Sequence, residues 1–217
     1  MTSIHKEKKM SKDPYRWSAG IYDSIFGSVN IGLRALGMRM APPEEGMRVL
    51  DVGCGTGVHL ELYKKHGCRL YGIDPSPAMM RVARNRLGED AELHLGEASS
   101  MPFNNGAFDL IVCMLVLHEV DPANRLPIIE EMKRVLDRNG RILFIDYHVG
   151  PAIPIGGWFS RLFILIAEKA AGRTHYKHFK DFKSNGGLPT LIETSRLVAV
   201  QQKIVGGGNL ALHVAEV

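Results

Sequence analysis

The sequence has few cysteines, no long hydrophobic run and little net charge, and each shortage excludes a class of protein. Among its 217 residues, only Cys54, Cys68 and Cys113 are cysteines. Their odd number and unpaired spacing exclude a disulfide framework, and no Cys/His cluster suggests zinc. No uncharged apolar run reaches the roughly 18 residues that span a membrane, and the first residues lack the apolar core of a signal peptide. We therefore expect a cytoplasmic protein.

The net charge of +4 is too small to indicate a nucleic-acid partner, because proteins that follow a nucleic-acid groove usually present a concentrated basic face. Residues 5–9 and 173–183 are locally basic. Hydrophobic residues make up 45% and charged residues 23% of the chain, which is typical of a globular protein. The length suits one domain with a substantial core. We expect residues 1–217 to form that single domain.

Short apolar runs alternate with helical patterns along most of the chain. Strands are predicted at 48–52, 69–73, 91–95, 108–114 and 141–146, and helices at 15–40 (one or two), 58–66, 75–87 and 122–137, the last closed by Asn139-Gly140. Such alternation indicates a parallel sheet covered by helices on both faces. Residues 196–205 and 209–217 read as two further strands, and the glycines 206–208 between them permit only a hairpin.

The predicted fold is therefore α/β and Rossmann-like, with a seven-stranded, mostly parallel sheet and an antiparallel hairpin at the carboxyl end. Residues 1–43 are expected to form a helical cap at the amino end. Residues 147–195 interrupt the alternation. We expect this insertion to be helical and to bind the substrate.

A glycine-rich loop, Asp-Val-Gly-Cys-Gly-Thr-Gly at residues 51–57, joins the first predicted strand to a helix. Glycines allow positive φ and close approach of a ligand, and ligands bind at the carboxyl ends of such strands. A dinucleotide site would place Gly or Ala where Val58 stands. Asp51 would repel a pyrophosphate but attract an ammonium group, as in the methionine part of S-adenosylmethionine. A plain turn without ligand is the alternative.

Asp74 ends the second predicted strand, 17 residues after Gly57. An acidic residue at this place accepts hydrogen bonds from ribose hydroxyls. Alone, Asp74-Pro75 could also be a helix cap. Together with Asp51 and the glycines, Asp74 favours a nucleoside ligand.

Residues 49–57, Asp74, the run Gly-Glu-Ala-Ser-Ser-Met-Pro-Phe at 96–103 and Phe108-Asp109 form a motif series. This series resembles that of class I S-adenosylmethionine-dependent methyltransferases, most closely the group with ubiquinone and menaquinone biosynthesis enzymes. The resemblance covers roughly residues 45–150. It is specific for cofactor and fold, and unspecific for substrate.

The resemblance implies a cofactor site for S-adenosylmethionine. The methionine part is expected on the glycine loop, the ribose on Asp74, the adenine near the second and third loops, and the methyl end beside the fourth strand. The implied residues are Asp51, Gly53, Cys54, Gly55, Gly57, Asp74, Pro75, Ser76, Glu97, Ala98, Cys113 and Met114. Glu97 departs from the family, which usually has Asp there. Tyr22 resembles a family tyrosine and either closes over the cofactor or packs in the core.

Methyl transfer requires alignment of acceptor, methyl and sulfur, and exclusion of water. It needs no metal, and a general base only if the acceptor must lose a proton. His118, directly after the fourth strand, is either that base or a packing contact under the cofactor. Tyr147 and His148, at the end of the fifth strand, are further candidates for contact with substrate.

The insertion is expected to select the acceptor. Between residues 157 and 171, large apolar residues share one helical face, which is either core, an acceptor pocket or a membrane-surface contact. The basic stretch 173–180 is either a solvated face or a site for an anionic head group. It could also supply His175, Tyr176 or His178 to the substrate site. An apolar stripe followed by basic residues suits a quinone-like or phospholipid acceptor.

The sequence thus predicts an S-adenosylmethionine-dependent methyltransferase with a small-molecule, apolar acceptor, no metal and no nucleic-acid partner. Two alternatives remain at this point: a nicotinamide-dependent oxidoreductase and a non-catalytic module that binds S-adenosylmethionine. The oligomeric state, the acceptor and its reacting atom are not predicted.

Overall fold

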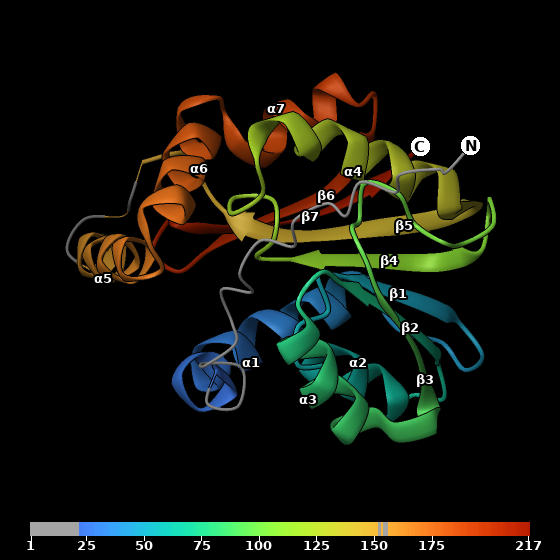
Figure 1. Cartoon of the computed structure of the whole chain (residues 1–217). Coiled ribbons are helices and arrows are strands. Elements are labelled where there is room, and N and C mark those ends of the chain that lie inside the picture. Colours follow the sequence, from blue (N-terminus) through green and yellow to red (C-terminus); the bar gives the residue numbers. More distant parts are fainter. Residues whose placement is uncertain (1–21, 152, 154–155) are drawn as a thin grey trace, which may run out of the picture.

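The computed structural model describes residues 22–151, 153 and 156–217, with side chains of residues 22–29 outside the described set. Its seven strands form one sheet in the order β3-β2-β1-β4-β5-β7-β6 (Figure 1). The strands are β1 Arg48–Val52, β2 Arg69–Asp74, β3 Ala91–Leu95, β4 Phe108–Met114, β5 Leu136–Tyr147, β6 Val198–Val205 and β7 Leu210–Glu216. The first five run parallel, and β7 is antiparallel to both neighbours. The predicted fold class is confirmed.

The strand order reverses between β1 and β4, because β2 and β3 lie on one side of β1 and β4 and β5 on the other. In open α/β sheets, ligands bind in the crevice beyond the carboxyl ends of the strands at such a reversal. The loops after β1 and β4 meet at this point. The topology therefore places residues 53–57 and 115–121 at one potential site.

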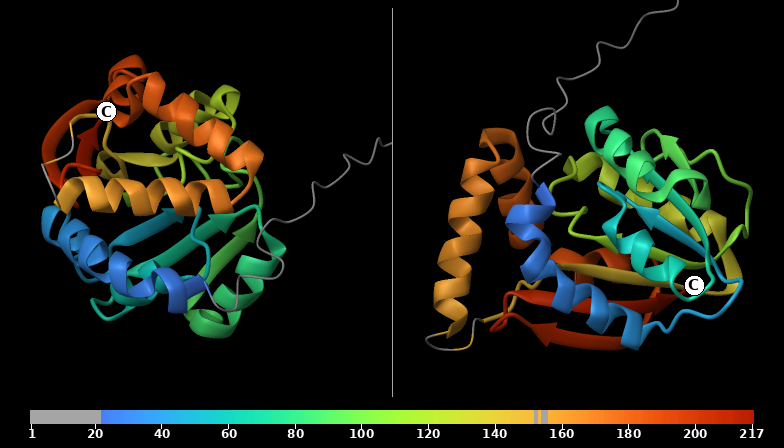
Figure 2. Two further views of the ribbon diagram at one scale, coloured as in Figure 1. Left: turned by 90° about the vertical axis from the view of Figure 1, so that its left-hand side faces the viewer. Right: turned by 90° about the horizontal axis from the view of Figure 1, so that it is seen from below.

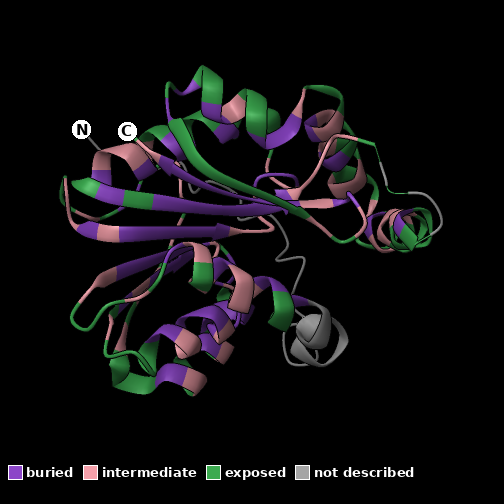
Figure 3. Ribbon diagram, turned by 180° about the vertical axis from the view of Figure 1, so that it is seen from behind, coloured by how far each residue is buried: buried purple, intermediate pink, exposed green. Residues whose placement is uncertain are grey.

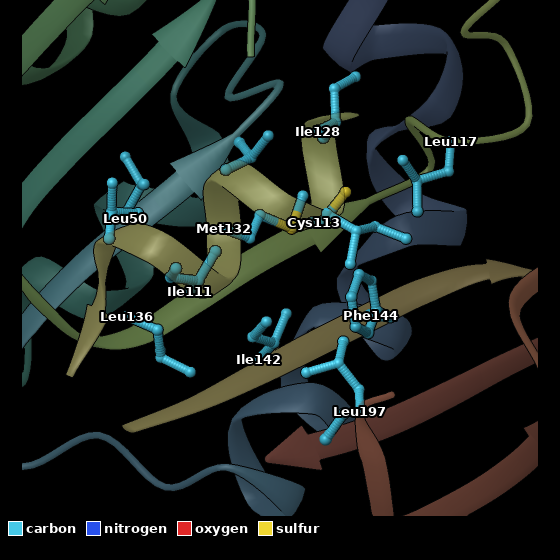
Figure 4. Close-up of a cluster of buried hydrophobic side chains, with 14 of the residues drawn as sticks. Leu50, Ile111, Cys113, Leu117, Ile128, Met132, Leu136, Ile142, Phe144 and Leu197 are labelled. Atoms are coloured by element: carbon cyan, nitrogen blue, oxygen red, sulfur yellow. The ribbon is translucent and has the colours of Figure 1, made fainter. Parts of the chain in front are cut away.

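Helices cover both faces of the sheet (Figure 1). They are α1 Tyr22–Met40, α2 Val58–Lys64, α3 Pro77–Leu87, α4 Pro122–Val135, α5 Gly156–Ala170, α6 Arg173–Ser184 and α7 Gly187–Thr194, with a short 3₁₀ turn at Gly88–Asp90. Alternate residues of a strand point to opposite faces. Val49 packs with helices α1 to α3, whereas Leu50 packs with helices α4 and α7. Figure 4 shows the latter cluster, which includes Cys113.

One predicted boundary is wrong. Helix α4 ends at Val135, and β5 begins at Leu136 rather than at Arg141. Leu136 is 6% exposed and pairs with Phe108, and the register shifts before the strand resumes. Asn139-Gly140 lies in this irregular part of β5 instead of closing the helix. The strand thus begins at a buried apolar residue that pairs with β4.

The insertion is helical, as predicted, and forms α5, α6 and α7. Viewed toward the carboxyl edge of the sheet, α5 lies between α1 and α6 (Figure 2, left). Its apolar face does not enter the core: five large side chains are 56–73% exposed, namely Trp158, Phe159, Leu162, Phe163 and Ile166. In Figure 3 the ribbon of this helix is coloured mostly as exposed or intermediate. The core interpretation of the stripe is therefore wrong, because α5 turns Gly157 and Glu168 inward.

None of the helices in the described part of the chain is long and apolar enough to cross a membrane.

Candidate active site

The glycine loop after β1 has a backbone shape that only glycine adopts readily. Gly53, Gly55 and Gly57 have φ of +72°, +52° and +79°, the left-handed region that other residues avoid. A Cβ at Gly53 would also meet the Val116 side chain at 2.4 Å. The loop is fixed to β2, since the amides of Gly53 and Cys54 both donate to the Ile73 carbonyl. A bare backbone surface results at the carboxyl edge of the sheet.

Asp51 is a buried carboxyl directly before this loop, 3% exposed. Burial raises its pKa to about 7; the charge of Arg34 opposes this shift and that of Asp74 adds to it. A buried carboxyl with so high a pKa gains most from a cation brought beside it. The ammonium group of a methionine moiety supplies such a cation.

Asp74 holds the loop in place from the end of β2. Its Oδ2 accepts a hydrogen bond from the Gly55 amide at 2.9 Å, and its Oδ1 accepts one from the Ser76 amide at 2.8 Å. The cap of helix α3 is Ser76, whose Oγ accepts from the Met79 amide. The helix-cap alternative for Asp74 is therefore wrong. Both carboxylate oxygens of Asp74 thus fix the backbone of the loops after β1 and β2.

The other residues implied in cofactor binding differ in what they can offer. The side chains of Cys54 and Cys113 are buried in the two core clusters, so only their backbone can face a ligand. Met114 and Ala98 are half-buried, and Pro75 and Glu97 are exposed. The Tyr22 side chain lies outside the described residues. The cradle of bare glycine backbone and two carboxylates fits the methionine end and ribose of S-adenosylmethionine.

A second group of functional side chains begins in the loop after β4. The chain bends at Leu115, which has φ of +57°, a strained conformation for a residue with a Cβ. The bend directs His118 back to β5. There its Nδ1 lies 2.7 Å from Asp146 Oδ1, and its amide donates to Asp146 Oδ2 at 3.3 Å. His118 is only 4% exposed.

The insertion completes this group, which we name the polar cluster: His118, Glu119, Asp146, Tyr147, Glu168 and His175. Helix α5 contributes Glu168, whose Oε1 accepts a hydrogen bond from the Tyr147 hydroxyl at 2.8 Å. His118 Nε2 lies 3.7 Å from the same oxygen. Helix α6 contributes His175, whose Nε2 lies 2.7 Å from Glu168 Oε2 and whose Nδ1 lies 3.5 Å from Glu119 Oε2. Four separate elements thus meet at one point.

The electrostatics of the polar cluster follow from these contacts. Burial by itself lowers the pKa of His118. The charge and hydrogen bond of Asp146, together with the charges of Glu168 and Glu119, outweigh this burial effect and raise the pKa to about 9. Burial raises the pKa of Glu168, yet the hydrogen bond from His175 and the charges of both imidazoles lower it overall. At neutral pH, the free protein therefore holds His118 protonated beside Glu168.

Aromatic rings and one arginine hold the polar cluster in shape. The ring centroid of His118 lies 4.6 Å from that of Tyr147 and 6.2 Å from that of Phe179. Arg125, 4% exposed, ties the insertion to the core. It donates to the Leu117 carbonyl at 2.9 Å, to Asp181 at 2.6 Å and to the His178 carbonyl at 2.7 Å.

The structure brings together three of the six side chains predicted for catalysis or substrate binding: His118, Tyr147 and His175. Burial and the nearby charges of Arg161 and Lys183 instead lower the pKa of His148. The ring of His178 contacts the Glu119 carbonyl, 2.8 Å away. Tyr176 stacks on Phe179. Of these three side chains, His178 therefore meets the polar cluster only at a backbone carbonyl.

The sequence analysis assigned no role to four residues that build this site: Glu119, Asp146, Glu168 and Arg125. A single acidic residue at the end of an apolar helix gives a weak signal for Glu168. Arg125 had no signal, since an arginine in a polar helix is usually exposed.

Comparisons with known proteins agree with this geometry. Residues 50–144 match the family described as Methyltransferase domain. The chain is 28% identical over 199 residues to demethylmenaquinone methyltransferase of Lactococcus lactis, covering 84% of this chain and 78% of that protein. It is also 28% identical to phosphatidylethanolamine N-methyltransferase of Cereibacter sphaeroides, covering 93% of each.

Among solved structures, a SAM-dependent methyltransferase from Aquifex aeolicus superposes with a TM-score of 0.66 at 19% identity, covering 95% of this chain and all of that one. That likeness shows the fold. The chain is therefore a methyltransferase that is similar to S-adenosylmethionine-dependent enzymes.

Proposed function

We propose that this methyltransferase acts on a small molecule with an apolar body, whose reacting group binds beside the polar cluster. The observation that carries the proposal is the double role of α5. One face of the helix exposes Trp158, Phe159 and three further apolar side chains to solvent, and the other delivers Glu168 into the buried cluster. Exposed apolar area of this kind is typical of an interaction surface.

The cofactor is proposed to lie along the loops after β1, β2 and β3. Asp51 and the glycine backbone would hold its methionine end, and Asp74 its ribose. Pro75, Ser76, Glu97 and Ala98 would lie near the adenine. When bound, S-adenosylmethionine supplies an electrophilic methyl group on its sulfonium. The contact between Gly53 and Val116 sets the glycine loop against the loop that carries His118, which supports placing the methyl end toward the polar cluster.

The chain's own residues would contribute orientation and exclusion of water. Tyr147, Phe179 and the His118 ring would form aromatic walls, beside the hydrogen-bonded pair of Glu168 and His175. Holding the reactants in line can supply several kcal/mol of the barrier reduction, up to about 7–11. Two relatives support an apolar body, because one is named for a quinone and the other for a phospholipid.

Label transfer tests this proposal. The protein is incubated with methyl-labelled S-adenosylmethionine and, separately, a lipid extract and a polar metabolite extract. We expect label in the lipid fraction. Label confined to polar metabolites would refute the apolar acceptor.

A matched pair of variants locates the contact. Phe159→Glu, on α5, should lower kcat/KM for the apolar acceptor about tenfold or more, which is the effect of losing roughly 1.4 kcal/mol of apolar contact. Val200→Glu adds the same charge at an exposed apolar position of β6, 44% exposed, and should leave kcat/KM unchanged. Calorimetric titration with S-adenosylhomocysteine should give the same affinity for both variants, and NADH should not bind.

A further inference from the structure

Three side chains of the polar cluster converge as metal ligands do. A ring nitrogen of His118, a carboxylate oxygen of Glu168 and a ring nitrogen of His175 all lie within 4.8 Å of one another. They come from the loop after β4, from α5 and from α6. We propose that these residues bind a divalent transition-metal ion, with Zn²⁺ as the best fit.

Each proposed ligand is held by an outer partner, as the ligands of metal sites usually are. Asp146 contacts the Nδ1 of His118 at 2.7 Å and so leaves Nε2 facing Glu168. The Tyr147 hydroxyl donates to Glu168. Glu119 Oε2 lies 3.5 Å from the Nδ1 of His175, whose Nε2 faces the shared point. An accidental meeting of polar groups would not be expected to supply such a partner to every member.

The charge of the polar cluster also favours a cation. It contains three carboxylates, Asp146, Glu168 and Glu119, against two imidazoles. Glu168 and Asp146 are 5% and 2% exposed, and a buried carboxylate is costly unless a partner compensates it. A divalent ion would be such a partner.

The ligand chemistry selects the ion. Two histidines and one glutamate form a set found in catalytic zinc sites, which leave a further position for water or substrate. Without thiolate or many oxygen ligands, the set suits Zn²⁺ better than Mg²⁺ or Ca²⁺. An ion here would bind and polarise an acceptor oxygen; this role rests on the proposed function, whereas metal binding does not.

The test measures binding without cofactor or acceptor. The full chain is dialysed against a chelator and titrated with Zn²⁺ by calorimetry, with Mg²⁺ as a second titrant, and bound metal is counted by elemental analysis. We expect one equivalent of Zn²⁺ and much weaker binding of Mg²⁺. The wild-type protein with Co²⁺ should show visible ligand-field bands of a nitrogen- and oxygen-ligated site. No bound equivalent and no such bands would overturn the proposal, whether or not any variant folds.

Variants assign the site. Glu168→Gln keeps the size of the side chain and His175→Ala removes a ligand, so both should lose the bound equivalent; Tyr147→Phe should weaken affinity about 10- to 100-fold. The matched control is His94→Ala, because His94 also pairs with a carboxylate, Glu92 at 2.6 Å, but lies outside the cluster on β3. Equal zinc affinity of Glu168→Gln and wild type would overturn the assignment, as would equal losses in His94→Ala.

The two proposals fail separately. If zinc binds but no label reaches an apolar acceptor, only the proposed acceptor is wrong. If the chelated, metal-free protein shows no zinc site yet transfers label to lipid, only the metal site is wrong.

Discussion

The glycine loop after β1 and the polar cluster after β4 lie at the same edge of the sheet but are built from different material. The first consists of backbone that three glycines shape within seven residues, supported by Asp51 and Asp74. The second consists of side chains from β5, α5, α6 and the loop after β4. The glycine loop, which is the proposed cofactor side, is local in sequence. The polar cluster, which is the proposed acceptor side, exists only after the insertion packs.

This difference predicts different sensitivities. A backbone site should fail when a side chain is added, because its shape depends on positive φ and close approach. A side-chain site should fail when its supporting contacts are removed, because several elements must stay in register. The following experiments test this contrast, in order of decreasing expected effect.

The largest effect is expected for Gly53→Ala on the cofactor side. The new Cβ would meet Val116 at 2.4 Å and force alanine to a φ of +72°. Left-handed strain and overpacking together should lower the free energy of unfolding by about 2–5 kcal/mol and abolish binding of S-adenosylhomocysteine in calorimetry. Gly46→Ala is the control, since Gly46 has φ of +78° with no atom within 4 Å of the added Cβ. Similar behaviour of the two variants would contradict a close-packed cradle.

Arg125→Met should affect the acceptor side alone. Arg125 holds α6 through Asp181 and the His178 carbonyl, and breaking a buried, hydrogen-bonded charge pair costs about 3 kcal/mol. We expect that loss in urea unfolding and a raised KM for the acceptor, with unchanged affinity for S-adenosylhomocysteine. Arg173→Met, at an exposed position, should change neither. A parallel loss of cofactor affinity would show that the two sides are not independent.

Asp51 gives the cofactor side a pH dependence. Its pKa is raised to about 7, and an ammonium ligand favours the ionised form. As pH falls below 7, the proton must be lost on binding, so affinity for S-adenosylhomocysteine should fall, approaching about tenfold per pH unit. Asp51→Asn should weaken binding about 10- to 100-fold, equivalent to roughly 1.4–2.8 kcal/mol, and remove this slope between about pH 5 and 7. A variant that keeps the slope would assign it to another group.

The smallest effect is expected at the amino ends of β1 and β4, at the opposite edge of the sheet, where Arg48 meets Asp109. The hydrogen bond from Arg48 lowers the pKa of Asp109, and both side chains are about one third exposed. The pair therefore stabilises the fold above the unfolded pKa of about 3.8 and loses this effect as pH falls below it. Asp109→Asn should lower the free energy of unfolding by about 0.5–1 kcal/mol at neutral pH. The difference from wild type should vanish near pH 3; a constant difference would exclude the ion pair as its cause.

The two sides also differ in how well the sequence predicted them. The structure builds the glycine cradle from residues that the sequence analysis named, which are Asp51, Gly53, Gly55 and Gly57. These residues lie together because strand, turn and helix follow one another without intervening segments. Their proposed roles in binding remain predictions. The β5 boundary was wrong because Leu136 gains more from pairing with Phe108 in the sheet than from another helical turn, and local propensity does not include that partner.

On the acceptor side, the sequence analysis named His118, Tyr147 and His175 as candidates. It did not predict that the three side chains meet in one cluster. The apolar stripe of α5 favoured a core helix, whereas its inward face is formed by Gly157 and Glu168. A hydrophobic stripe shows which face of a helix favours burial. It does not show whether the protein's own core or another molecule covers that face. His148 and Tyr176 are close in sequence to the right residues but point to other neighbours.

The sequence by itself determined the class of fold, the glycine loop, the cofactor chemistry and the helical insertion, because each depends on residues within a few turns of one another. Only the tertiary structure decided the polar cluster: it placed His118 against Asp146, turned Glu168 inward from α5 and brought His175 to it from α6. Contacts between residues so far apart in the chain depend on how the elements pack, and no local pattern encodes that packing.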